Sequence, residues 1–139
     1  MNKKYKLLKK EDNGLCRIQA LKDFGSIQKG EKGGFIEQED NLSQEGNCWV
    51  YGDAWVYGDA WVYGDARVYG NAWVYGDAMV YGDARVYGDA RVYGNARVSG
   101  NARVSGRINL KISCNFEISR ITIDTKKKLQ KLKSFLDNF

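Results

Sequence analysis

The chain has 139 residues, a formal net charge of +5, and neither histidine nor proline. This length suits one domain with a small attached module, and no apolar stretch approaches the about 20 residues that a membrane-spanning helix needs. The basic first ten residues lead into no apolar segment, so no secretory signal is expected.

The first 47 residues contain no repeat and are expected to form a capping module. Cys16, Ile18 and Ala20 alternate with polar neighbours, as in a strand with one buried face. Glycines then divide the segment into turns and short strands; they are Gly25, Gly30, Gly33, Gly34 and Gly46. The open end of a stacked repeat exposes unpaired backbone groups, which such a module would cover. The alternative is a ligand-binding element, although residues 30–34 lack the spacing of a phosphate-binding P-loop.

Residues 48–107 repeat a six-residue unit ten times without a gap, with the consensus Ala-Arg-Val-Tyr-Gly-Asp. Ala and Val lie two positions apart, so on a strand they point to the same face. Small Ala and branched Val suit a buried surface, whereas the residues on either side of Val point outward. Gly and Asp or Asn then turn the chain, because they tolerate a positive φ. Such a short period predicts a solenoid whose repeats bury their apolar face by stacking.

The hexad period and the inward Ala/Val pair resemble the left-handed parallel β-helix of hexapeptide-repeat proteins. The segment before the repeat adds to the resemblance through Leu21, Asp23-Phe24-Gly25, Lys29-Gly30, Gly33-Gly34-Phe35, Leu42-Ser43 and Gly46-Asn47-Cys48-Trp49. Over residues 15–107 the chain is similar to bacterial and prophage-encoded hexapeptide-repeat proteins of uncharacterised function, some of which carry a transferase label based on fold. The resemblance implies left-handed winding and three hexads per coil. The usual motif has a small residue directly after the aliphatic one, where this chain has Tyr or Ser, so its corner is expected to differ.

Three hexads per coil stack residue n on residue n+18, about 4.8 Å away. The ten hexads give a little over three coils, and two looser hexads around Asn109 and Cys114 continue them, with Leu110 and Phe116 at the Val positions. We therefore expect an all-β fold. A left-handed parallel β-helix of about four coils over residues 48–119 would lie between the capping module of residues 1–47 and a tail of residues 120–139.

The outward positions of the hexads form columns that carry the candidate binding residues. Before Val the columns read Trp49-Arg67-Arg85-Arg103, Trp55-Trp73-Arg91 and Trp61-Met79-Arg97. After Val the early coils carry Tyr, including Tyr51, Tyr57, Tyr63 and Tyr75. Stacked aromatics and Trp–Arg pairs stabilise neighbouring coils, which is a sufficient structural explanation of the columns. The aromatic residues of the first coils would expose a larger apolar patch than a monomer usually has. We therefore expect part of this patch to be covered by a second copy of the chain, by the capping module folding back, or by a flat ligand.

The tail is predicted to form a basic amphipathic helix after a last strand with Ile121 and Ile123, and Asp124 or Thr125 is the expected N-cap. Its candidate interface residues recur at three- and four-residue steps; they are Leu129, Leu132, Phe135, Leu136 and Phe139. Three roles stay open: a plug on the open end of the solenoid, a contact with a neighbouring subunit, or binding to an acidic membrane or nucleic acid.

No catalytic residue, metal site or cofactor is predicted. Cys16, Cys48 and Cys114 are far apart and lack metal-ligand spacing, so we expect buried thiols in a reducing cytoplasm. Many acyltransferases with the resembled fold use a catalytic histidine as general base, and this sequence has none. The corner aspartates repeat in equivalent surroundings, which favours neither catalysis nor Ca²⁺ binding.

These patterns predict a non-enzymatic binding or scaffolding protein of phage or prophage origin that self-associates as a homotrimer. Its further partners would be a host protein that it inhibits, or a small nucleotide or sugar. Nucleic acid is not an expected partner, because residues 48–107 hold six Arg and six Asp, whereas residues 108–139 hold seven basic and three acidic residues. The alternative function is a hexapeptide-type acyltransferase that uses an acyl-coenzyme A, and a third is carbohydrate adhesion through the aromatic columns.

Overall fold

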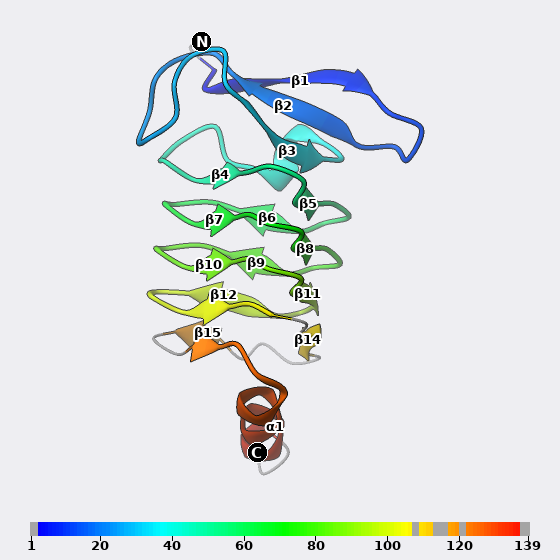
Figure 1. The fold of residues 1–139 in the computed structure, drawn as a ribbon, viewed down its shortest axis with the longest axis vertical. Coiled ribbons are helices and arrows are strands. Elements are labelled where there is room, and N and C mark those ends of the chain that lie inside the picture. The colour runs from blue at the N-terminus through cyan, green and yellow to red at the C-terminus, as the bar shows by residue number, and fades with distance from the viewer. Residues whose placement is uncertain (1–2, 107–108, 113–116, 120–121, 137–139) are drawn as a thin grey trace.

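The computed structural model describes residues 3–106, 109–112, 117–119 and 122–136. Its strands form a stack of about four coils, with a β-hairpin over the N-terminal end and a helix at the opposite end (Figure 1). Most neighbouring strands pair in parallel and come from successive coils. The chain therefore folds as an all-β solenoid with one C-terminal helix, as the repeat predicts.

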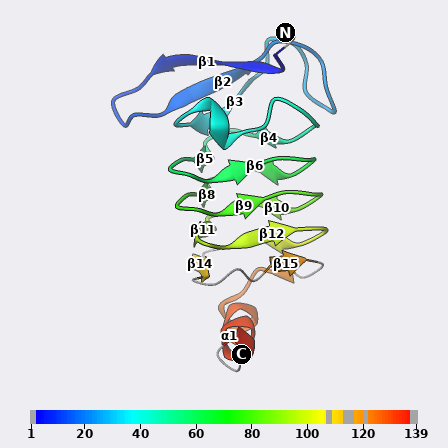
Figure 2. The same cartoon turned by 180° about the vertical axis from the view of Figure 1, so that it is seen from behind.

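Three sheets form the three faces of the solenoid (Figures 1 and 2). The first face contains β1 (Tyr5–Lys10), β2 (Cys16–Ala20), β3 (Lys32–Ile36), β5 (Trp55–Val56), β8 (Trp73–Val74), β11 (Arg91–Gly94) and β14 (Asn109–Ile112). The second face contains β4 (Trp49–Val50), β7 (Arg67–Val68), β10 (Arg85–Val86), β13 (Arg103–Val104) and β16 (Thr122–Ile123). The third face contains β6 (Trp61–Val62), β9 (Met79–Val80), β12 (Arg97–Ser99) and β15 (Glu117–Ser119).

Within the strict repeat, residue n lies beside residue n+18. Val56 pairs with Val74 on the first face, and Arg67 pairs with Arg85 on the second. Backbone hydrogen bonds follow the same spacing, as from the Trp55 amide to the Ala72 carbonyl at 2.9 Å. The predicted columns are therefore confirmed.

Alanine and valine fill the interior of the solenoid. Every Ala and Val of the hexads from Val50 to Val104 is at most 1% exposed, and Cys48 occupies the small inward position of the first hexad. The inward positions of these hexads hold apolar side chains. Small and branched side chains alternate around each coil, so they can pack closely. This interior is the one that the period-two pattern predicts.

The corners depend on glycine in the left-handed region. Gly70 has a φ of +68°, and the Ala72 amide donates to the Tyr69 carbonyl across the turn at 3.4 Å. A Cβ on Gly70 would lie 2.9 Å from the Gly88 nitrogen of the next coil. In the hexads with tyrosine the residue after Val thus stays outside and the glycine after it makes the turn, whereas the serines at the same position, Ser99 and Ser105, are buried.

The last coil departs from the predicted spacing. Leu110 pairs with Val92, 18 residues earlier, but Val98 pairs with Ile118, 20 residues later. The prediction that Phe116 occupies the Val position is therefore wrong; Phe116 and Cys114 themselves lie outside the described residues. The physical reason is that no Gly-Asp corner follows Gly106, so the corners no longer have a constant length.

The first coil begins before the strict repeat. Phe35 and Ile36 in β3 pair in parallel with Trp55 and Val56, and Leu42 bridges to Val62. Residues 32–47, with the 3-10 helix η1 (Glu39–Asn41), therefore belong to an irregular coil, and the boundary at residue 47 marks only where the hexads start.

Gly33 and Gly34 let β3 cross close to the coil beneath it. Cβ atoms on them would lie 2.5 Å from the Val50 carbonyl oxygen and 2.7 Å from that of Ala54. This close approach is a structural explanation of the glycine pair, and β1 and β2 extend the same sheet as an antiparallel hairpin.

The C-terminal helix α1 (Lys126–Leu136) follows β16. The hydroxyl of Thr125 accepts a hydrogen bond from the Lys128 amide at 3.2 Å, which confirms Thr125 as a cap. Leu129 is buried in the core and Leu132 packs against it, whereas Phe139 and the side chains of Phe135 and Leu136 are not among those described. No helix in the described part of the chain is long and apolar enough to cross a membrane.

Candidate binding surfaces of the solenoid

The first face carries a ladder of flat side chains, formed by Trp55, Trp73 and Arg91. The two indole rings stack at 4.5 Å with an interplanar angle of 1°, and the Arg91 guanidinium lies 3.9 Å from the Trp73 ring centroid. The Arg91 side chain also donates to the Asp89 carbonyl at 3.0 Å. The half-buried rings thus present a rigid edge to solvent, and their stacking contributes about 0.5–1.5 kcal/mol per pair.

Tyrosine stacks run along the corners beside these columns. Beside the first-face ladder, Tyr57 stacks on Tyr75 and Tyr75 on Tyr93, with centroids 4.9 and 4.8 Å apart. Burial raises the pKa of both Tyr57 and Tyr75, so their phenols stay neutral hydrogen-bonding groups near neutral pH. This stack widens the aromatic surface of the first face.

Trp61 on the third face is the most exposed tryptophan, at 41%. Its ring stacks on Tyr63 at 3.9 Å, and Met79 follows it in the column. A groove of about 530 Å³ beside Trp61 is lined largely by polar and acidic side chains, including Glu39, Asp40 and Asp59. Trp61 is therefore exposed at an outward position, and its part in binding stays a prediction.

The second face carries the arginine column of Arg67, Arg85 and Arg103. None of the described residues forms an ion pair with these three arginines. A hollow of about 390 Å³ adjoins Arg67 and Arg85 and is otherwise lined by Ser26, Tyr51 and Tyr69. Tyr51 and Arg67 thus meet in one concave site, although they come from successive coils.

Trp49 is not available to a partner, so its assignment to the binding surface is wrong. Its side chain is 0% exposed and lies edge-on to Phe24 at 5.2 Å and to Tyr5 at 6.1 Å. The capping module folds back over the second face at this point, which is one of the three kinds of cover that the sequence leaves open. The indole nitrogen of Trp49 has no hydrogen-bond partner there.

Lys4 joins the capping module to the first coil, and sequence reasoning missed it. The side chain is 1% exposed, and its ammonium donates to the carbonyls of Cys48 at 2.8 Å, Gly46 at 3.3 Å and Glu45 at 3.4 Å. Among the described residues, no backbone amide donates to these three carbonyls. Burial lowers the pKa of Lys4. In the sequence Lys4 is one of several lysines in a basic start, and nothing in that pattern marks it as buried.

Asn41 plays a similar part beside the third face. Its amide donates to the carbonyls of Gly58 at 3.1 Å and Ala60 at 2.9 Å, while its carbonyl oxygen accepts from the Glu37 and Gln38 amides. Polar side chains of the cap thus replace the backbone partners that the first coil lacks.

The described cysteines do not form a reactive centre. Cys16 and Cys48 are both buried and free. The Cys48 sulfur lies 3.4 Å from the Lys4 ammonium, but burial outweighs this neighbour and raises the pKa of the thiol. A buried thiol with a raised pKa is a poor nucleophile. Among the described residues, no three Cys, Asp or Glu side chains come together as metal ligands.

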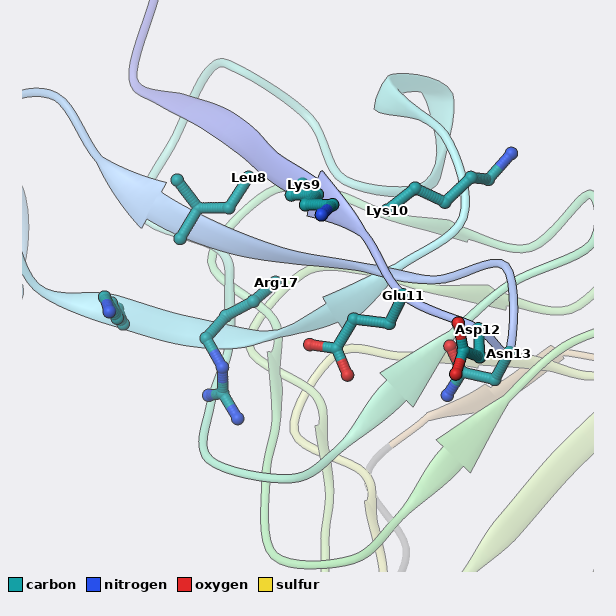
Figure 3. Close-up of a pocket in the computed structure, with 8 residues that line it drawn as sticks. Leu8, Lys9, Lys10, Glu11, Asp12, Asn13 and Arg17 are labelled. Carbon is teal, nitrogen blue, oxygen red and sulfur yellow. The ribbon is translucent and has the colours of Figure 1, made fainter.

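A further hollow of about 720 Å³ lies beneath the β1–β2 hairpin (Figure 3). It is lined by Leu8, Lys9, Lys10, Glu11, Asp12, Asn13, Arg17 and Lys32. Arg17 is already engaged, because its guanidinium donates to the Gly33 carbonyl at 2.7 Å and lies 4.2 Å from the Phe35 ring centroid. None of the predicted binding residues lies in this hollow.

The fold and its period define a repeat β-helix protein. Four overlapping segments, residues 60–76, 72–88, 84–98 and 96–107, match the family model of the YdcK β-solenoid repeat. Together they span residues 60–107, which are the last eight of the ten hexads and about a third of the chain. A search of curated proteins found no match to the chain.

Proposed function

We propose that this chain is a non-enzymatic binding and scaffolding protein that self-associates as a homotrimer through its outward aromatic columns. The first-face ladder carries the proposal, because Trp, Tyr and Arg are the residue types that dominate protein interfaces. The indole rings of the ladder stack at 4.5 Å and the tyrosines Tyr57 and Tyr75 beside it at 4.9 Å, so little side-chain freedom is lost on binding. Trp61, at 41% exposure, adds a second accessible aromatic group.

The absence of histidine from the whole sequence supports a non-enzymatic binding function over an acyltransferase function. A transferase of the resembled kind needs a general base near neutral pH, and the tyrosines stacked beside the ladder, Tyr57 and Tyr75, have raised pKa values. A cytoplasmic location and a phage or prophage origin complete the proposal. The first is supported by two buried free thiols, and the second by the resemblance over residues 15–107.

Light scattering after size-exclusion chromatography tests self-association. The wild type is expected at three times the 15.8 kDa mass of one chain, and Trp55→Ala and Trp73→Ala are expected to shift the mass toward one chain. Arg97→Ala, at the equivalent outward position of the third face and outside the named binding residues, serves as the matched control and is expected to leave the mass unchanged. A monomeric wild type would refute self-association through the ladder.

Two further measurements separate the other functions. Thermal stabilisation by coenzyme A would favour the acyltransferase, whereas the proposal predicts an unchanged melting temperature. Binding on a glycan array that Trp61→Ala abolishes would favour carbohydrate adhesion. Co-purification with an inhibited host protein, lost in Trp55→Ala, is the result that the binding function predicts.

A further inference from the structure

The arginine column of the second face brings together three guanidinium groups that form no ion pair with a described carboxylate. Arg67 pairs with Arg85, and Arg85 with Arg103, on strands about 4.8 Å apart. Like charges directly opposite each other on neighbouring strands are destabilising, and no described carboxylate forms an ion pair with them. Arg91 on the first face is different, because it lies over Trp73 and donates to backbone carbonyls. The second face therefore favours an anion.

The tyrosine stack of the second face is interrupted at this place. Tyr69 and Tyr87 are stacked at 4.8 Å with an angle of 2°, but Tyr51 is turned by 81° from Tyr69, with centroids 6.1 Å apart. At the other two corners the first pair is parallel: Tyr57 with Tyr75 at 4°, and Tyr63 with Tyr81 at 5°. The break in the stack thus occurs only where the hollow lies.

The hollow brings these two features together under the cap. Tyr51 and Tyr69 form its aromatic side, Arg67 and Arg85 its cationic side, and Ser26 of the cap adds a hydroxyl. Its volume of about 390 Å³ falls within the range of sites for small ligands. Half-buried arginine beside tyrosine is well suited to phosphate, because guanidinium binds phosphate oxygens in pairs and stacks on rings.

We infer that the hollow between Tyr51, Tyr69, Arg67 and Arg85 binds a small planar aromatic phosphate, of the nucleotide class. The ring of the ligand stacks against tyrosine at the break, and its phosphate is held by the two guanidinium groups. This inference rests on the proposed function only in taking the solenoid as a binding scaffold, and it uses a face other than the first-face ladder.

The corner carboxylates limit the ligand to a small one. Asp65 and Asp83 line a second hollow together with the same three arginines, on the side of the column away from the tyrosines. A long polyanion lying along the column would meet these carboxylates, whereas a single phosphate at the tyrosine side would not. The geometry therefore favours one nucleotide over a nucleic acid strand.

Isothermal titration calorimetry tests the site with adenosine monophosphate, adenosine and inorganic phosphate as probes. Adenosine monophosphate is expected to bind once per chain and at least tenfold more tightly than either of the other two probes. Arg67→Gln and Arg85→Gln are each expected to weaken binding at least tenfold. Arg97→Gln removes an arginine at the equivalent hexad position of the third face and is expected to change the dissociation constant less than twofold.

Three results would overturn the inference: no heat at millimolar adenosine monophosphate, equal affinity for inorganic phosphate, or an equal loss in Arg97→Gln. Melting curves of all variants by circular dichroism show whether each is folded, and either second-face variant alone is sufficient for the test. The mass by light scattering is independent of this titration. A trimer that binds no probe refutes only the inference, and a monomer that binds the nucleotide refutes only self-association.

Discussion

Replacing Lys4 by methionine is expected to destabilise the capped end of the solenoid more than any exposed lysine substitution. The ammonium donates to three carbonyls, of which the Cys48 contact at 2.8 Å is the shortest. Hydrogen bonds from charged groups contribute about 1.5–3 kcal/mol each, but two of the three are long, and removing the buried charge recovers its desolvation cost. The expected loss in the free energy of unfolding is therefore about 2–4 kcal/mol, because buried carbonyls are left without their donor.

Urea denaturation monitored by circular dichroism measures this loss. Lys6→Met, in strand β1 two residues after Lys4 and with an exposed side chain, is the matched control and should change the unfolding free energy by less than about 0.5 kcal/mol. If Lys4→Met is as stable as Lys6→Met, the view that cap side chains satisfy the carbonyls of the first coil is wrong.

Three further predictions concern the interior, the corners and the cap. Val74→Ala, at a fully buried position, should lower the unfolding free energy by about 2 kcal/mol in urea titrations, and a neutral effect would contradict a packed interior. Gly52→Ala and Gly70→Ala both place a side chain at positive φ, at a cost of about 1–2 kcal/mol. Gly70→Ala should cost more, because only its Cβ meets the next coil; equal melting temperatures would refute the close stacking of corners. Burial raises the pKa of Tyr5, so above about pH 10 the unfolded chain loses this proton and the folded chain keeps it. Stability should therefore fall with rising pH by up to about 1.4 kcal/mol per pH unit from this residue, and Tyr5→Phe, compared with wild type in denaturation between pH 9 and 11.5, should show a shallower fall.

The interior and the outward columns could be predicted because each hexad carries its own strand and corner. Ala and Val alternate with outward residues on a period of two, and Gly with Asp turns the chain, so Arg67 over Arg85 follows from the spacing alone. The strand register of the last coil could not be predicted in the same way. Ile118, not Phe116, stands opposite Val98, because the chain there lacks the corner residues that keep the repeat length constant.

The sequence predicts that a cap covers the first coil, but it does not predict which residues of the cap contact that coil. An open coil requires cover, yet the contacts that bury Trp49 join Tyr5 and Phe24 to a residue more than 20 positions later. Lys4 looks like part of a solvated basic start, and only its position over the carbonyls of residues 45–48 gives it a role. The hollow beside Tyr51 likewise includes a residue of the cap, Ser26, which the hexad pattern does not reveal.

The stacking of residue n on residue n+18 determines which side chains share a face, and a pair of introduced cysteines tests it most directly. Asp59 and Asp77 are exposed corner residues of adjacent coils, and the Asp59 amide donates to the Gly76 carbonyl at 2.9 Å. Oxidation of the double variant Asp59→Cys/Asp77→Cys should form an intramolecular disulfide, identified by peptide mass spectrometry. The double variant Asp59→Cys/Asp83→Cys, whose positions lie at different corners, should form none. A disulfide in the second variant and none in the first would contradict three strands per turn.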